Sequence, residues 1–290
     1  MAIPFTLLRA FHAVAEHGGF TAAANALGIG QPTVTTQVKE LEERYGVELF
    51  LRSGRQIQLT TAGEALVEIT RRMIALRQDA HDLLSGYGEF RSGDLRLAAV
   101  GPFHAAEMIA RFSKDYPNIH ISMLLGNSEQ TLEHILKLHA DIAILARTIE
   151  DPRVVTLPFS THRIIAFVPR THPLFSRSEV TLAQLAAERF VLREPGSTTR
   201  RALEAAMQEN GLPIDCALEI GSREGVWKAV LEGLGVGVVT DFEFVAHPDL
   251  KALTISDADI TVEYRLACLK DRRQSPKIRA FIDTVLGPGC

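Results

Sequence analysis

Amide and hydroxyl side chains gather in one short segment near the N-terminus, which begins Gln31-Pro32 and continues through Thr33, Thr35 and Thr36. Such side chains hydrogen-bond to phosphates and to base edges. Residues 17–38 contain no Asp, Glu, Lys or Arg, and DNA carries roughly one negative charge per 1.7 Å of its axis, so a carboxylate there would repel it. The segment predicts a DNA-contacting helix start, with a solvated polar helix face as the alternative. The set is completed by Thr21, Lys39, Arg52 and Arg55.

A second cluster combines hydroxyl groups with arginines. Ser197, Thr198 and Thr199 fall at the expected start of a helix, between Arg193 and Arg200. Helix N-termini and guanidinium groups together hold phosphate, phosphonate, sulfate or carboxylate groups. We therefore predict a small-anion site. In the alternative interpretation the hydroxyls only cap the helix, and the arginines pair with Glu194 and Glu204.

Other loops at the expected strand ends complete this second site. In open α/β sheets, ligands bind at the carboxyl ends of the strands. An acidic residue, Glu194, Glu129 or Glu224, would offset an amine on the ligand. The remaining predicted site residues are Gly101, Pro102, Phe103, His104, Asn127, Ser128, Ser222, Arg223 and Glu224.

The elements that must position the first site lie within residues 1–60. Apolar residues at helical spacing predict a first helix that ends at Gly18-Gly19. Thr21 is the expected N-cap of an alanine-rich second helix, and a third helix runs from Thr33 to about Tyr45. Strand-like pieces at 47–51 and 56–59 follow. This order predicts a winged helix-turn-helix, all-α apart from its small wing.

A long helical pattern without glycine or proline follows, from about residue 64 to Leu84. Its apolar residues are spaced three and four apart, as in the seam of a short coiled coil. The pattern predicts a linker helix at 61–90 through which two chains associate. In the alternative, the helix packs on its own domain. The seam consists of Leu66, Ile69, Met73, Leu76, Ala80 and Leu83.

Strand and helix patterns alternate through residues 91–290, which predicts an α/β domain. The strands are expected near 95–100, 119–124, 142–145, 163–168, 190–192, 218–220 and 236–240. Helices fit near 105–114, 128–138, 198–210 and 224–232. We expect two lobes, one formed by residues 91–161 plus 268–290 and the other by residues 162–267.

Composition limits the class of protein. The chain has 290 residues, 46% of them hydrophobic and 23% charged, which is typical of a globular protein with about two domains. Its three cysteines form no CxxC pattern, and neither a secretion signal nor a membrane span is evident. We therefore expect a cytoplasmic protein without metal, cofactor or membrane partner. The net charge of −4 disfavours DNA only if its location is ignored.

Two other functions remain as alternatives. The lobes of the second domain would permit a solute-binding receptor, against which the attached helix-turn-helix and the missing signal peptide count. An α/β enzyme is the other alternative, although no nucleophile or acid–base constellation is evident and we expect none.

Several motifs resemble those of the LysR-type transcriptional regulators. They include Phe20–Leu27, Gln31–Val38, Gly46–Phe50 and Leu59–Gly63, and in the second domain Gly93–Leu97, Gly126–Glu129, Ala140–Ile144 and Gly233–Val238. The resemblance covers the whole chain. It departs at Gly30 and Thr36, where many members have a serine and a basic residue, which weakens the helix cap and one DNA contact.

The resemblance implies a regulator that binds a double-stranded DNA operator as a homodimer or homotetramer, assembled through the linker helix and the second domains. Gln31, Pro32, Thr35 and Thr36 then meet bases or backbone, and Arg55 makes the wing contact. The second domain, similar in fold to periplasmic binding proteins, senses a small effector between its lobes. RNA polymerase is a further partner that the family allows. Within the family, residues 31–38, 42–50, 193–201 and 218–224 are similar to regulators associated with aminoethylphosphonate catabolism.

Overall fold

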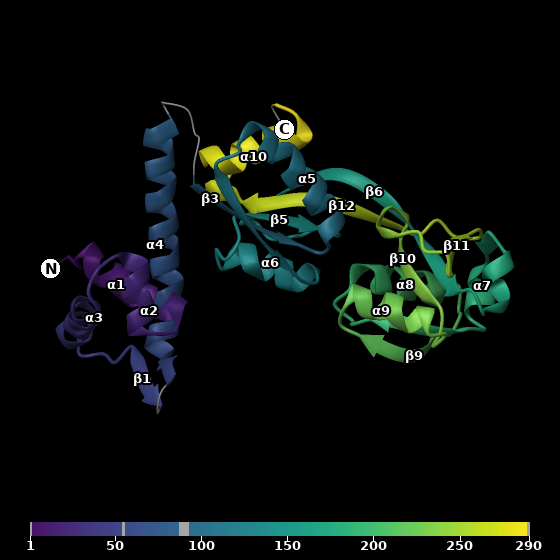
Figure 1. Ribbon diagram of the computed structural model, residues 1–290, viewed down its shortest axis with the longest axis horizontal. Coiled ribbons are helices and arrows are strands. Elements are labelled where there is room, and N and C mark those ends of the chain that lie inside the picture. The colour runs from purple at the N-terminus through teal and green to yellow at the C-terminus, as the bar shows by residue number, and fades with distance from the viewer. Residues whose placement is uncertain (1, 54–55, 87–92, 289–290) are drawn as a thin grey trace. The chain divides into compact units, whose positions relative to one another are not determined.

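The computed structural model describes residues 2–53, 56–86 and 93–288 (Figure 1). The chain divides into two compact units, residues 1–90 and 91–290. No described helix is both long and apolar enough to cross a membrane.

Three helices and a two-stranded wing form the first unit. These elements are α1 (Phe5–His17), α2 (Phe20–Leu27), α3 (Gln31–Tyr45), β1 (Phe50–Ser53) and β2 (Gln56–Leu59). Each of the three helices ends at a glycine with a positive φ, at Gly18, Gly28 and Gly46, because the left-handed conformation costs glycine least. Phe11 and Val34, both fully buried, are at the centre of the core.

The starts of two helices differ from the sequence prediction. Gly19, not Thr21, is the N-cap of α2, and no side chain caps that helix. Thr21 therefore lies within α2 and is exposed. The third helix begins at Gln31, two residues earlier than expected, because Pro32 fits the first turn, where its missing N–H is not needed. Gly30 supplies no side-chain cap, as the departure at this position predicts.

The linker helix α4 (Thr61–Gly86) contacts its own unit along one face and exposes apolar residues along another. Val67 and Thr70 are buried against the core, and Arg71 forms an ion pair with Glu16 at 2.8 Å. The predicted seam is divided between these faces. Leu66 packs on the core, whereas Ile69, Met73 and Leu76 are exposed; Leu83 lies outside the residues with described side chains.

The sheets of the second unit are built mainly from strands that pair across long sequence separations. The main sheet has the order β4-β3-β5-β12-β6-β11-β7, with β10 also paired to β6, and β8 and β9 form a separate parallel pair. The bounds are β3 Gly93–Ala99, β4 Ile119–Leu125, β5 Ile142–Leu145, β6 Val154–Pro169, β7 Glu179–Val180, β8 Arg189–Arg193, β9 Asp215–Ile220, β10 Gly237–Thr240, β11 Leu250–Ile255 and β12 Thr261–Leu269.

Helices cover these strands and place their N-termini at the strand ends. In Figure 1, α5 and α10 lie on one side of strands β3, β5 and β12, and α6 lies on the other. The helices are α5 (Pro102–Asp115), α6 (Ser128–Leu136), α7 (Leu182–Leu185), α8 (Thr198–Glu209), α9 (Arg223–Leu231) and α10 (Pro276–Leu286). Short 3₁₀ turns occupy Pro173–Ser176, Asp241–Glu243 and Lys270–Arg272.

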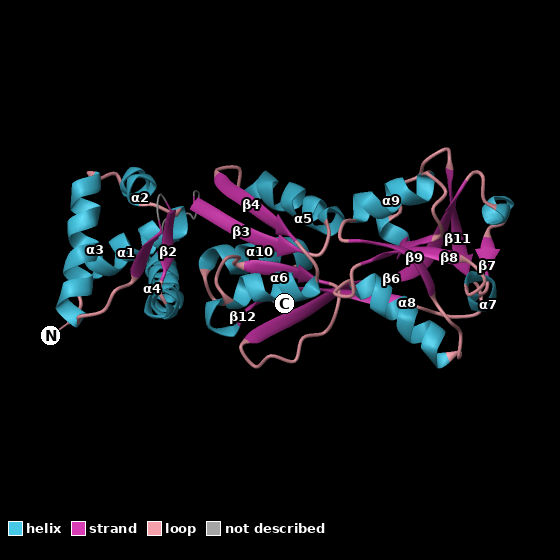
Figure 2. Ribbon diagram, turned by 90° about the horizontal axis from the view of Figure 1, so that it is seen from below, coloured by secondary structure: helices cyan, strands magenta, loops and turns pink. Residues whose placement is uncertain are grey.

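Two long strands connect the lobes, as Figure 2 shows for β6 and β12. The first half of β6 pairs with β12, and its second half pairs with β10 and β11. Residues 265–267 of β12 also pair with β5, which is in the first lobe. These residues thus belong to the sheet of the first lobe, although the predicted boundary at residue 267 places them in the second.

Candidate functional site

The predicted DNA-contacting residues lie on the exposed face at the start of α3. Gln31, Pro32, Thr33 and Thr36 are exposed, whereas Val34 and its neighbour one turn later, at position 38, are buried. The Thr35 hydroxyl donates to the carbonyl of Gln31 at 3.0 Å, so its lone pairs stay available to a donor. The face thus offers hydroxyl and amide groups without a carboxylate.

The wing is held to the far end of α3 by hydrogen bonds. The Glu42 carboxylate accepts from the backbone N–H of Leu49 at 2.8 Å and of Phe50 at 3.3 Å. Close packing supports this contact, because a Cβ on Gly63 would lie 2.2 Å from the carbonyl oxygen of Leu49. These contacts fix β1 relative to the helix that is expected to read the DNA.

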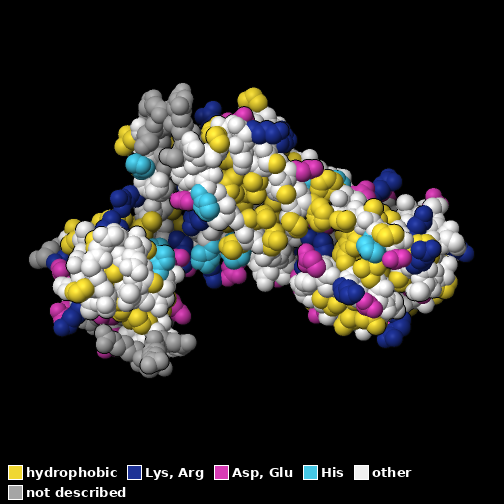
Figure 3. All heavy atoms as spheres, in the orientation of Figure 1, with side chains coloured by type: hydrophobic (Ala, Val, Ile, Leu, Met, Phe, Trp, Pro, Cys, Tyr) yellow, Lys and Arg dark blue, Asp and Glu magenta, His cyan; other side chains and the backbone are white. Residues whose placement is uncertain are grey.

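Few cations flank this surface among the described side chains. Lys39 forms an exposed ion pair with Glu43 at 3.3 Å, so its charge is largely offset. Arg52 lies in β1, but its side chain is outside the described residues, as is all of Arg55. In Figure 3, the face of this unit turned to the viewer carries few charged side chains.

The predicted anion site is a closed cleft in the second unit. Two cavities of about 20 Å³ each share Arg193, Ser197, Thr199 and Arg223 as lining residues. The first is completed by Phe167, Val226, Trp227, Val238 and Val239, and the second by Val100, Asn127, Ser128, Ala146, Thr198 and Tyr264. The structure thus brings together predicted residues from three different loops.

Direct contacts between the lobes keep the cleft closed. The hydroxyls of Ser128 and Thr198 are 2.8 Å apart, and the Glu129 carboxylate is 3.6 Å from the Arg201 guanidinium. Gly196 lies against the Asn127 amide, where a Cβ would come within 2.5 Å of Nδ2. A ligand larger than a water molecule therefore requires these contacts to open or shift.

Carboxylates pair with the arginines that were expected to bind the anion. Arg193 donates to Glu194 at 2.8 and 3.0 Å, and the Arg223 guanidinium is 3.1 Å from the Glu243 carboxylate. Burial favours a raised pKa for Glu194, but hydrogen bonds, led by those from Arg193, outweigh it and lower the pKa below its usual range.

Arg200 differs from the prediction because its guanidinium is held away from the cleft cavities. It donates to Glu204 at 2.6 Å, to Glu219 at 2.7 Å and to the Arg193 carbonyl at 2.7 Å, and it lines neither cavity. The alternative interpretation is therefore correct for the Arg193–Glu194 and Arg200–Glu204 pairs. It is wrong for Ser197, which is at the N-cap position of α8 but makes no side-chain capping hydrogen bond.

Four further predicted residues lie beside the cleft and line neither cavity. Ser222 caps α9 by accepting from the Gly225 N–H at 2.9 Å, and Glu224 is exposed. Pro102 begins α5, while Gly101 packs against Arg223 and Glu243. The prediction that these four residues line the cleft is therefore wrong, and Glu194 also lines neither cavity.

His104 and Phe103 contribute to an aromatic cluster beneath the cleft. The His104 ring stacks on Phe242 at 4.1 Å between centroids, and it also contacts His162 and Tyr264 at 5.0 and 4.7 Å. Phe103 meets the same Phe242 edge-on. Burial and the nearby His162 lower the pKa of His104 to about 4. The cluster joins α5, β6 and β12 where the strands cross between the lobes.

Sequence reasoning missed Glu243, Tyr264 and Trp227 as parts of the cleft. Glu243 is 1% exposed and pairs with Arg223, while Thr240 connects it to Tyr264 through hydrogen bonds at 3.1 and 3.4 Å. Glu243 follows a strand end, which is a usable signal. Tyr264 is in mid-strand and Trp227 is in mid-helix, so neither position marks it as a site residue.

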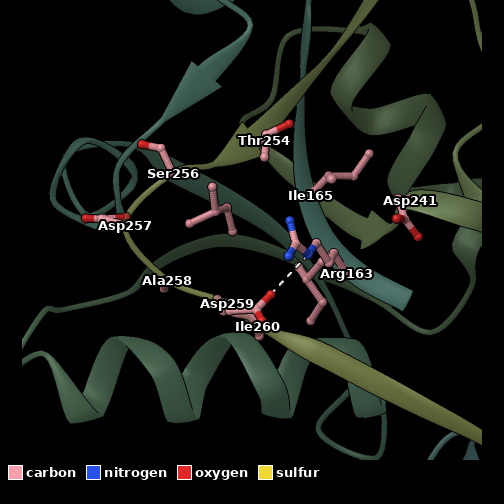
Figure 4. A pocket seen from close by; sticks show the side chains of 11 residues that line it. Arg163, Ile165, Asp241, Thr254, Ser256, Asp257, Ala258, Asp259 and Ile260 are labelled. Atoms are coloured by element: carbon pink, nitrogen blue, oxygen red, sulfur yellow. Dashed lines mark ion pairs between the residues drawn. The ribbon is translucent and has the colours of Figure 1, made fainter. Parts of the chain in front are cut away.

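A larger hollow of about 570 Å³ lies away from these residues, on the second-lobe side of the strand crossing. Figure 4 shows Arg163 in it, paired with Asp259 at 3.1 Å. Asp241 and Asp257 line it as well, but Asp257 accepts from the Leu182 N–H and Asp241 pairs with His162. Its charged side chains thus already have partners within the chain.

Comparison with known families accounts for both units. Residues 5–64 match the "Bacterial regulatory helix-turn-helix protein, lysR family", and residues 88–287 match the "LysR substrate binding domain". The chain belongs to the LysR family. It is a DNA-binding transcriptional regulator with a C-terminal effector-binding domain, and this family is not enzymatic.

Several LysR relatives cover nearly the same length. CbbR of Rhizobium meliloti is 31% identical over 99% of this chain and 94% of its own. The activator CmpR of Synechocystis is 29% identical over 94% and 91%, and CysL of Bacillus subtilis is 30% identical over 81% and 80%. None of these three names refers to aminoethylphosphonate, so the narrower resemblance to aminoethylphosphonate regulators stays a prediction.

Solved LysR structures share the fold. Full-length CbnR complexed with its target DNA has a TM-score of 0.73 at 23% identity, over 98% of this chain and 99% of that one. The Synechocystis PCC6803 CcmR regulatory domain, solved in complex with 2-PG, has a TM-score of 0.61 at 26% identity and covers 67% of this LysR regulator.

Proposed function

We propose that this LysR regulator binds a promoter operator through the start of α3 and responds to a small anionic effector held between the two lobes of its second unit. Gln31, Thr35 and Thr36 contact DNA, assisted by Thr21, Pro32, Thr33, Lys39 and the wing arginines. The supporting observation is an exposed helix start that carries hydrogen-bonding groups and no acidic residue. The partial positive charge of the helix N-terminus adds to the attraction for phosphate.

The anionic character of the effector rests on the unused N-terminus of α8. Ser222 caps α9 and Asn127 caps α6 with side-chain oxygens, whereas Ser197 leaves the first N–H groups of α8 without a side-chain acceptor. Ser197 is 7% exposed and lines both cavities beside Arg193 and Arg223. An acceptor oxygen from an anion satisfies this arrangement.

The proposed effector class is a small phosphonate, sulfonate or carboxylate, with 2-aminoethylphosphonate as the first candidate. Two observations support a compact ligand. The cavities are small, and the CcmR regulatory domain, which is similar to this one, was solved with a bound ligand, 2-PG. The resemblance of residues 193–201 and 218–224 to aminoethylphosphonate-associated regulators supports the first candidate.

Assembly through α4 completes the proposal. Ile69, Met73 and Leu76 form an exposed apolar stripe with coiled-coil spacing, and a second copy of the helix would bury it. We propose a homodimer or homotetramer, which doubles the weak DNA contacts of one subunit. RNA polymerase is the proposed partner of the DNA-bound form.

A mobility-shift assay with the DNA upstream of the protein's own gene tests the DNA-binding part. Retardation at low salt is expected, and its absence on this and neighbouring promoters contradicts the proposal. A thermal-shift screen tests the ligand, because a ligand specific for the folded state raises stability by RT ln(1 + [L]/Kd). Stabilisation by neutral aromatic compounds, and by none of the anions, would show that the cleft is assigned wrongly.

A further inference from the structure

The arginines of the cleft are already neutralised before a ligand arrives. Glu194 accepts two hydrogen bonds from Arg193, and Glu243 forms an ion pair with Arg223. Beside them, Arg201 pairs with Glu129 and Arg200 with Glu204. Burying a lone charge in such a site is costly unless it is paired. A simple anion that enters therefore adds a negative charge to a set of cations whose charges are already compensated.

The two carboxylates differ in how easily they can serve a ligand. Glu243 is 1% exposed and is tied into the hydrogen bonds of Thr240, so it belongs to the fixed wall of the cleft. The side chain of Glu194 is 23% exposed, and it stands at the start of the loop that leads to Ser197. Glu194 itself lines neither cavity, but its carboxylate pairs with Arg193, which lines both, so Glu194 is the partly exposed carboxylate at the edge of the cleft.

A tight turn sets the distance between Glu194 and the anion position. The Ser197 N–H donates to the Glu194 carbonyl at 2.9 Å, which closes a four-residue turn with Pro195 and Gly196 at its centre. The Cα atoms that flank such a turn lie within roughly 7 Å of each other. Glu194 and the N-terminus of α8 are therefore neighbours, and the Arg193 side chain, which lines both cavities, links the Glu194 carboxylate to the cleft.

We propose that Glu194 determines the charge class of the effector: it receives an ammonium group, so that the cleft selects a small zwitterion over an anion of the same size. The anionic end of the zwitterion binds at Ser197 and the first N–H groups of α8, near Arg223. Its ammonium end binds the Glu194 carboxylate, which keeps the ion pair with Arg193. The bound ligand then adds one negative charge fewer to the closed cleft than the same anion without its amine. This inference rests on the proposed anion site and states which anions that site accepts.

Matched ligand pairs separate this inference from the function on which it rests. We name 2-aminoethylphosphonate with ethylphosphonate, taurine with ethanesulfonate, and β-alanine with propionate. The members of a pair share the acidic group and differ by the amine. Calorimetric titration of the full chain with the preferred pair is expected to show tighter binding of the amine-bearing member, by on the order of 10-fold, as for a hydrogen bond between charged groups.

The substitution Glu194→Gln removes the charge and keeps the shape. In this variant the preference for the amine-bearing member is expected to disappear, and the amine-free anion is expected to bind more tightly than to the wild type because Arg193 is freed. Glu209→Gln, at an exposed acid at the end of α8, is the matched control and should leave both affinities unchanged. Melting temperatures without ligand verify that both variants fold.

The outcomes are distinct. If no member of any pair binds the wild type, the proposed anion site fails and this inference fails with it. If anions bind but Glu194→Gln weakens both members equally, or leaves the preference intact, the anion site stands and the role of Glu194 is refuted. A purely structural role for Glu194 predicts one of these last two results, and not the reversal.

Discussion

The two surfaces expected to bind negatively charged partners differ in the groups that they present. The start of α3 has hydroxyl and amide groups, and residues 17–38 contain no Asp, Glu, Lys or Arg. The cleft instead holds Arg193 and Arg223, each paired with a carboxylate. An exposed surface can bind a polyanion with partial charges because water and ions stay nearby. A closed cleft must be neutral when empty, since unpaired buried charge is expensive.

The largest effect should follow from placing a charge on the uncharged surface. Thr35→Asp puts a carboxylate where phosphates and base edges are expected, and each lost base contact costs about 1–3 kcal/mol per subunit. We expect operator affinity to fall roughly 100-fold or more in a dimer, with anion binding unchanged. Fluorescence anisotropy of labelled promoter DNA measures it.

Thr284→Asp is the matched control for this change. Thr284 donates to the carbonyl four residues earlier, at 2.8 Å, as Thr35 does at 3.0 Å, but it is on α10 of the other unit. Its DNA affinity should equal that of the wild type. Equal losses in the two variants would show that the effect is a general one on folding.

The next largest effect should come from leaving a charge of the cleft unpaired. Arg223→Gln leaves the buried Glu243 carboxylate without its cation. Breaking a buried pair in this way lowers the free energy of unfolding by about 3 kcal/mol. Urea unfolding followed by the emission of Trp227, the single tryptophan, reports on this lobe. Lys228→Gln removes an exposed ion pair from the same helix and should cost under about 0.5 kcal/mol. Equal losses would show that the Arg223 pair contributes no more than a surface pair.

A smaller, pH-dependent effect should come from His104. Its pKa in the folded state is about 4, below the ordinary 6.5, so the unfolded chain binds the proton more readily. Above pH 6.5 the ring is neutral in both states, so it does not affect the free energy of unfolding. As the pH falls from 6.5 towards 4, the unfolded chain takes up the proton first, and the free energy of unfolding decreases. In the His104→Phe variant, the free energy of unfolding should decrease less on acidification than in the wild type. The difference should be on the order of 1–2 kcal/mol, after allowance for partial solvent access.

Urea titrations at pH 7.5 and pH 5 measure the His104 effect as a difference between variants, so that other titrating groups cancel. His120→Gln, at an exposed histidine, serves as the control and should keep the wild-type pH dependence. If His104→Phe keeps it too, burial of the ring does not depress its pKa.

The smallest effect should follow from removing a cation next to α3. Lys39 is highly exposed and its charge is offset by Glu43, so Lys39→Gln should weaken DNA binding by less than roughly 3-fold. The slope of log K against log salt should change by under about 1. A loss as large as that of Thr35→Asp would show that cations, and not polar groups, dominate this surface.

The first unit follows closely from its sequence. Gly18, Gly28 and Gly46 end three helices where the sequence predicts, because left-handed caps are a local property of glycine. The errors are equally local: Thr21 is a good cap by residue type, but the backbone places Gly19 at that position. Local chemistry therefore determines most of the first site.

The cleft is less predictable because its partners are distant in sequence. The predicted loops do meet at Ser128 and Thr198, since both follow strand ends. The pairing of Arg223 with Glu243 and the contact of Thr240 with Tyr264 depend on how β10 and β12 lie in the sheet. No periodic pattern encodes such a register, and β12 was not predicted from the sequence at all.

The proposal that the cleft controls DNA binding requires that the two binding sites be linked. The affinity of labelled promoter DNA for the full chain should be measured with and without 2-aminoethylphosphonate, and the affinity of that ligand should be measured with and without DNA. If the ligand acts as the effector, both affinities change by the same factor, because coupling between binding sites is reciprocal. Binding of both partners with no change in either affinity would contradict the claim that the cleft controls DNA binding.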